Sequence, residues 1–144
     1  MDVSELRKRI LHSLDAARKD ASNRRTLVDE AAKAYEEFLE NTAVPLFRQA
    51  VAVLNAAGSS FVAHTPAGSV RLALEATPQT FLEIVLDTTG EIPQVVGRVS
   101  LARARQGQIV DERPIARDRP VAALTDEDVS AFLVAEIPKL IIKR

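Results

Sequence analysis

Residues 70–87, VRLALEATPQTFLEIVLD, decide the fold, because apolar and polar side chains alternate along both halves of this stretch. Alternation with a period of two is typical of strands that bury one face. The turn pair Thr77-Pro78 separates the halves, so the stretch predicts two antiparallel strands with a short connection. The predicted core side chains are Val70, Leu72, Leu74, Leu82, Ile84 and Leu86.

Further strands are predicted on both sides of this pair. Residues 60–64 form a short first strand, and residues 94–105 and 108–115 form two longer ones. Turn residues separate all of them, including the Gln106-Gly107 pair, and links of hairpin length favour antiparallel neighbours. Residues 58–116 therefore predict a four- to five-stranded antiparallel meander.

Helical segments flank the predicted sheet. Residues 1–57 contain no glycine and are rich in Ala, Leu, Glu, Lys and Arg. Residues 125–142 begin with Thr125 and three acids, which the helix dipole favours in a first turn, and continue with an apolar stripe of the kind that is buried. Strands grouped between helices indicate a single α+β domain over 1–144, with the helices on one sheet face.

The N-terminal segment is longer than a body of this size can cover. A helix over residues 2–57 would be ~84 Å long, whereas a compact domain of 144 residues has a radius of gyration of ~14–15 Å. Either the helix turns back near residues 20–25, or its first half projects. Pro45 is expected to kink it or start a new helix, and Pro138 to make the C-terminal helix end irregular.

An apolar seam at heptad spacing follows the first half of this helix. Arg7 and Arg24 interrupt the seam, and several of its members are small alanines, so it predicts a weak coiled coil. Residues 1–25 carry a net charge of +3 and residues 26–57 a net charge of −3. These two segments could therefore attract each other within one chain or between two chains. We expect a homodimer. The self-association residues are Ile10, Leu14, Ala17 and Ala21.

Composition argues against several classes of function. The chain has no cysteine, a net charge of −1 and no G-x-G-x-x-G or P-loop spacing, so no thiolate chemistry or nucleotide motif is expected. No stretch reaches the ~18 apolar residues that span a bilayer, and the charged residues among the first fifteen lead us to expect no secretory signal. We therefore expect a cytoplasmic protein without metal or cofactor.

Three weaker constellations remain as alternatives. His64 ends a strand beside a turn, and Glu75, Glu83 and Asp87 are predicted on one face, which is the residue set of a small enzyme. Cross-strand pairing of these acids with arginines is the simpler interpretation. An arginine-rich hairpin is the candidate anion or nucleic-acid site, although it has no aromatic residue for base stacking. Its residues are Arg98, Arg103 and Arg105.

Taken together, these patterns favour a non-catalytic interaction or scaffold module that self-associates through its N-terminal helix. The biological role and the identity of any further partner do not follow from the residues. The second face of the sheet, with Ala73, Phe81, Val85 and Ala102 between charges, is expected to face solvent or a partner.

Overall fold

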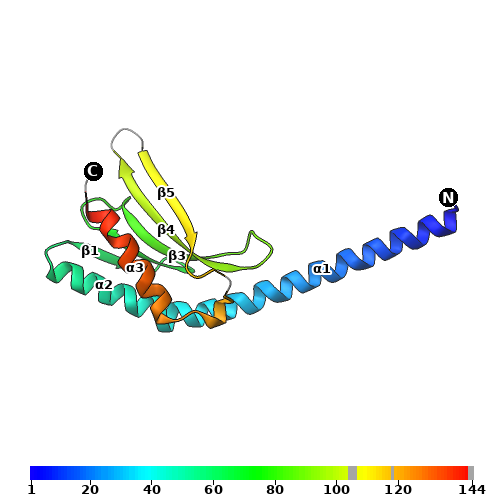
Figure 1. The fold of residues 1–144 in the computed structure, drawn as a ribbon, viewed down its shortest axis with the longest axis horizontal. Helices are drawn as coiled ribbons and strands as arrows, with labels where there is room; N and C mark the ends of the chain where they lie inside the picture. Colours follow the sequence, from blue (N-terminus) through cyan, green and yellow to red (C-terminus); the bar gives the residue numbers. More distant parts are fainter. Residues whose placement is uncertain (104–106, 118, 143–144) are drawn as a thin grey trace.

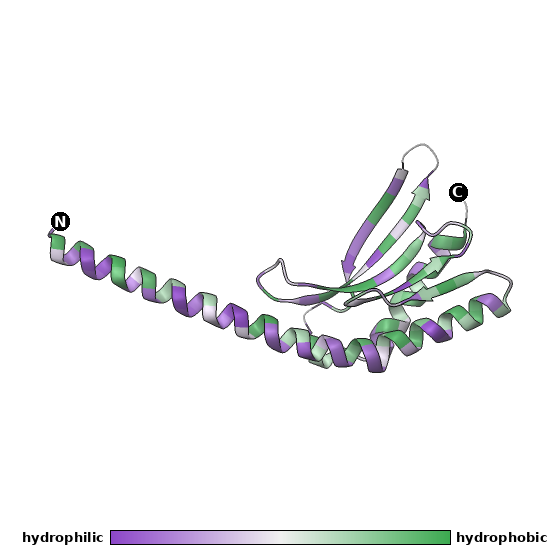
Figure 2. Cartoon of the chain, turned by 180° about the vertical axis from the view of Figure 1, so that it is seen from behind, coloured by the Kyte–Doolittle hydropathy of each residue, from purple (hydrophilic) through white to green (hydrophobic). Residues whose placement is uncertain are grey.

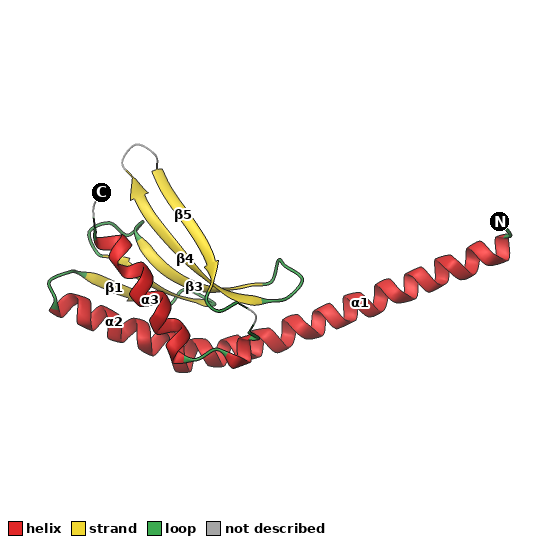
Figure 3. Ribbon diagram, viewed as in Figure 1, coloured by secondary structure: helices red, strands yellow, loops and turns green. Residues whose placement is uncertain are grey.

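The structure is a computed structural model that describes residues 1–103, 107–117 and 119–142 (Figure 1). A long helical rod leads into a five-stranded sheet, and a shorter helix ends the chain (Figure 3). The rod comprises α1 (Val3–Phe38), the π-helical turn η1 (Leu39–Ala43) and α2 (Val44–Ala56). The strands are β1 (Phe61–His64), β2 (Ser69–Leu74), β3 (Phe81–Asp87), β4 (Gln94–Arg103) and β5 (Gly107–Pro114). A 3-10 turn, η2 (Val121–Ala123), precedes α3 (Asp126–Ile141).

The strands pair antiparallel in the order β1-β2-β3-β4-β5, which confirms the predicted meander and the α+β class. Leu72 lies opposite Leu82, and Leu82 opposite Val99, so apolar residues meet across three strands on one face. On the other face, Glu83 lies opposite both Arg71 and Arg98. The alternation seen in the sequence thus sorts the two faces as expected.

The apolar face of the sheet is covered by α2, α3 and the C-terminal end of α1. Phe47 from α2 and Phe132 from α3 are fully buried in the same core cluster as Val70 and Ile84 of the sheet. The ring of Phe132 lies directly over Gly97, where an added Cβ would come within 2.4 Å of the ring carbons. Any larger residue at position 97 would therefore push α3 away from β4.

The first part of α1 projects from the body (Figure 1). Asp2 caps the start of the helix, since its carboxylate accepts from the amide of Ser4, and the helix runs without a break through residues 20–25. That stretch contains neither glycine nor proline, so no backbone hydrogen bond is lost there. Residues 1–27 are all exposed, and residues 3–27 alone span ~37 Å at 1.5 Å per residue.

The two prolines differ in outcome: Pro45 lies in the first turn of α2, which is the new helix start that the sequence predicted, whereas Pro138 lies inside α3. Before Pro45 the rod widens into a π-helical turn, in which the amide of Val44 donates to the carbonyl of Leu39 five residues back. Such a turn absorbs the missing proline donor without ending the rod. Near Pro138 the expected irregularity was wrong: α3 continues to Ile141, and the amide of Ile142 still donates to the Pro138 carbonyl.

Candidate interaction surface

The seam on the projecting half of α1 is uncovered. Ile10 is 50% exposed and Leu14 is 46% exposed, whereas Tyr35 and Phe38 on the same helix are 5% and 6% exposed. Figure 2 shows green apolar positions recurring between purple polar ones along this part of the helix. The exposed large side chains of this region are Val3, Leu6, Ile10, Leu11, Leu14 and Leu27.

The exposed seam and the buried part of α1 are one continuous stripe. The stripe alternates spacings of four and three residues, so on a straight α-helix it turns slowly, by ~20° per heptad, and follows one broad side of α1. Its positions are 3, 7, 10, 14, 17, 21, 24, 28, 31, 35 and 38. Ala31, Tyr35 and Phe38 pack into the core of their own chain. The body therefore covers only the last part of a stripe that begins at Val3. The predicted residues Ile10, Leu14, Ala17 and Ala21 all lie on the uncovered part.

Two polar contacts fix where the helix becomes attached. The Tyr35 hydroxyl lies 2.7 Å from the carbonyl oxygen of Gly68 and 3.2 Å from that of Ile84, and shares its proton between them. Burial, with a smaller effect of the Glu83 charge, raises the pKa of Tyr35, so the hydroxyl remains a donor. Further out, Arg24 donates to the carbonyl of Thr88 across 2.9 Å, in the loop between β3 and β4.

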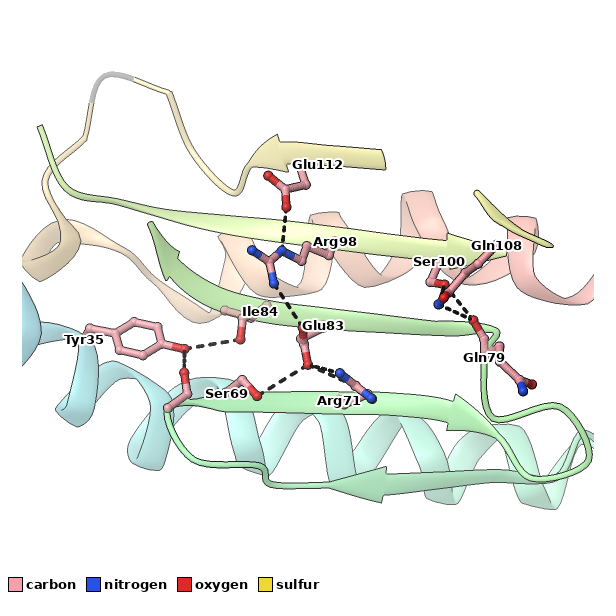
Figure 4. Close-up of polar contacts among 11 residues, drawn as sticks. Tyr35, Ser69, Arg71, Gln79, Glu83, Ile84, Arg98, Ser100, Gln108 and Glu112 are labelled. Atoms are coloured by element: carbon pink, nitrogen blue, oxygen red, sulfur yellow. Dashed lines mark hydrogen bonds and ion pairs between the residues drawn. The ribbon is translucent and has the colours of Figure 1, made fainter. Parts of the chain in front are cut away.

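A row of charges crosses the open face of the sheet (Figure 4). Glu83, only 5% exposed, accepts two hydrogen bonds from Arg71, at 2.9 and 2.7 Å. Arg98 lies 3.7 Å from the other oxygen of Glu83 and donates to Glu112 across 2.6 Å. The row Arg71–Glu83–Arg98–Glu112 thus alternates in charge across four strands, which is the cross-strand pairing that the sequence favoured.

These contacts also shield the apolar residues of that face. The Arg71 guanidinium lies 4.0 Å above the centre of the Phe81 ring. Ser100 is fully buried and donates to the carbonyl of Gln79, while Gln108 bonds to the Ser100 hydroxyl. Phe81 and Ser100 are therefore covered by side chains of the same chain.

A shallow, open depression of ≈ 540 Å³ lies between α1 and the open face. Tyr35, Ser69, Glu83 and Arg98 contribute its polar atoms. The Tyr35 hydroxyl and the Glu83 carboxylate are already engaged within the chain, so the arrangement stabilises the junction of helix and sheet. Of the three acids predicted to share a face, only Glu83 lines this depression. Glu75 follows the end of β2, and Asp87 accepts from the amide and hydroxyl of Thr89.

The remaining candidate residues lie apart from one another. His12 is exposed on α1, and His64 ends β1 opposite Arg71. Of the arginine hairpin, Arg98 is paired with two carboxylates, Arg103 ends β4 in an exposed position, and Arg105 lies outside the described residues. Within the described ranges, no group of three or more His, Asp or Glu side chains is placed to hold a metal ion.

The sequence did not indicate that Tyr35 anchors α1 to the sheet. Its phenol sits on the heptad stripe like an ordinary core residue, and only the fold shows that Gly68 and Ile84 present carbonyls to it. In the described part of the chain, no helix has the length and apolar character of a membrane span. Comparison with protein-family models, with curated proteins and with solved structures finds no match for this chain.

Proposed function

We propose that this protein is a non-catalytic interaction module whose copies associate through the projecting part of α1, residues 3–27. The observation that carries the proposal is the stripe of α1, which is buried at Tyr35 and Phe38 and continues uncovered to Val3. Water disfavours exposed apolar side chains, and a second helix with the same spacing would bury them. The body would then serve as the scaffold that holds this helix in place.

Helix stability also favours a partner. An isolated helix gains little free energy in water, because most of the stability of a helix in a protein comes from packing of its apolar face. The first 27 residues are all exposed, so they lack that packing in a single copy. Association would supply it. The small residues Ala17 and Ala21 on the seam limit the apolar area gained, so we expect micromolar rather than nanomolar affinity.

The direct test replaces Ile10 and Leu14 with aspartate in one chain. Burying two unpaired carboxylates in a helix–helix interface is costly, so the dissociation constant should rise roughly 100-fold or more. Sedimentation velocity over a concentration series gives the dissociation constant of each variant. The sheet should remain folded, because neither residue contacts the core.

The matched control places aspartate at His12 and Ala16. These positions have the same four-residue spacing and are exposed, but they lie on the opposite side of the helix because each residue turns the helix by ~100°. The control adds the same charge and a comparable helix cost. It should associate like the unmodified chain, and equal loss in both variants would show that the seam plays no special part.

A further inference from the structure

We infer that the two copies pair with their α1 helices antiparallel, centred near His12. This inference rests on the proposed self-association and adds the orientation and register of the partner. The occupant of the seam is thus the same seam of a second copy, running in the opposite direction. Three features of the described residues lead to it: the side on which the body lies, the point where the free seam ends, and the sizes and charges of the residues along it.

The position of the body opposes a parallel pair. Ala31, Tyr35 and Phe38, which continue the seam, pack into the core of their own chain, so each body lies on the seam side of its own helix. In a parallel pair both bodies would be at the same end of the helices and would clash in the space between them. In an antiparallel pair the bodies would lie at opposite ends, and the overlap would involve only the N-terminal part of α1, which projects from the body (Figure 1).

The free seam ends at Ala21. The next seam residue, Arg24, extends to the carbonyl of Thr88, which places the loop between β3 and β4 on the seam side of the helix there. A partner helix therefore has room from Val3 to Ala21. The midpoint of residues 3 and 21 is residue 12, and symmetric antiparallel overlap must be centred on it.

This register pairs seam residues that suit each other. Ile10 of one copy comes level with Leu14 of the other, and Val3 comes level with the small Ala21. Arg7, which interrupts the seam, comes level with Ala17, over which its aliphatic stem can lie while the guanidinium reaches water. A parallel pair would instead set Arg7 against Arg7 of the partner, a like-charge contact on the seam within the interface.

Three serines on α1 provide labelling sites for measuring the orientation of the two helices. Ser4, Ser13 and Ser22 are exposed, and the chain has no native cysteine, so each can be changed to cysteine singly and given one nitroxide label. Centring at residue 12 separates the two copies of each site along the axis by roughly 24, 3 and 30 Å, respectively, at ~1.5 Å per residue. Pulsed dipolar spectroscopy measures the distance between the two nitroxides of the dimer, which increases with this separation along the axis.

The expected result is a short distance for labels at position 13 and long distances for labels at positions 4 and 22. Similar short distances at all three positions would overturn the antiparallel orientation and leave self-association intact. An antiparallel pattern whose minimum lies away from position 13 would overturn the register. No dipolar signal, together with a monomer mass for all three labelled chains by light scattering, would overturn the proposed function itself.

Discussion

The hydroxyl of Tyr35 donates to the carbonyl oxygen of Gly68 across 2.7 Å, and this contact marks where α1 becomes part of the body. Beyond it, toward the N-terminus, the same helix carries the same apolar stripe without cover. The contrast between the two ends of one helix is the basis of the functional proposal. The same contact also gives a direct test of how the projecting segment is held.

Tyr35→Phe should destabilise the body by ~1–2 kcal/mol, because the buried carbonyl of Ile84 and the partly buried one of Gly68 lose their shared donor. The free energy of unfolding in urea measures the effect. The seam at Ile10 and Leu14 is untouched, so the dissociation constant at protein concentrations where the body is folded should not change. An unchanged unfolding free energy would mean that the hydroxyl does not anchor the helix.

Gly97→Ala should cost ~1–3 kcal/mol, because its methyl group would lie about 2.4 Å from the ring carbons of Phe132. Phe132→Leu removes the ring and should make the two changes together less costly than the sum of the separate ones. A double-mutant cycle of unfolding free energies measures this coupling. Strict additivity of the two changes would contradict the contact.

Glu83→Gln should destabilise the sheet by ~1–3 kcal/mol, because Arg71 and Arg98 would lose the buried carboxylate between them. Glu112→Gln is the matched control: it removes the same charge from the same row at an exposed position, where an ion pair contributes under about 1 kcal/mol. Thermal unfolding of the two variants gives the comparison. Equal effects would show that burial of Glu83 is unimportant.

The pH dependence of stability should include a contribution from Asp128 at the start of α3. Burial alone would raise the pKa of this carboxyl, but hydrogen bonds from Thr125 and Arg119 hold the pKa below its ordinary value. A lowered folded-state pKa means that the stabilisation is complete above the unfolded pKa of ~3.9 and is lost as the pH falls through the folded value.

Asp128→Asn should therefore lower stability at pH 7 by ~1 kcal/mol, the usual contribution of a helix cap. The difference between variant and unmodified chain should shrink as the pH drops below about 4. Unfolding free energies between pH 7 and pH 3 test this. A difference that stays constant over that range would contradict the assignment to Asp128.

Much of the body could be predicted from the sequence, because alternation and turn residues act locally. The Leu72–Leu82 pair and the strand order follow from hairpin-length links. Contacts between distant segments could not be predicted. The residues around Gly97 in the sequence do not indicate that the Phe132 ring packs on it. The pairing of Arg98 with Glu112 depends on the register of β4 and β5.

The candidate surface on α1 could also be predicted only as far as local sequence patterns determine it. Heptad spacing identifies Ile10 and Leu14 within one helix, but it does not say whether residues 20–25 turn the chain back. The structure answers that question: the helix runs straight through them and projects. Where the body covers the stripe depends on Tyr35 and Phe38 meeting the sheet, which is a long-range event.

The most direct test of the central claim is the molar mass of the unmodified chain in solution, measured by light scattering from about 1 to 200 μM, a range that spans micromolar affinity. Self-association through α1 predicts a rise from the chain mass of 15.7 kDa toward twice that value as the concentration increases. A mass that stays at 15.7 kDa throughout the range would contradict it.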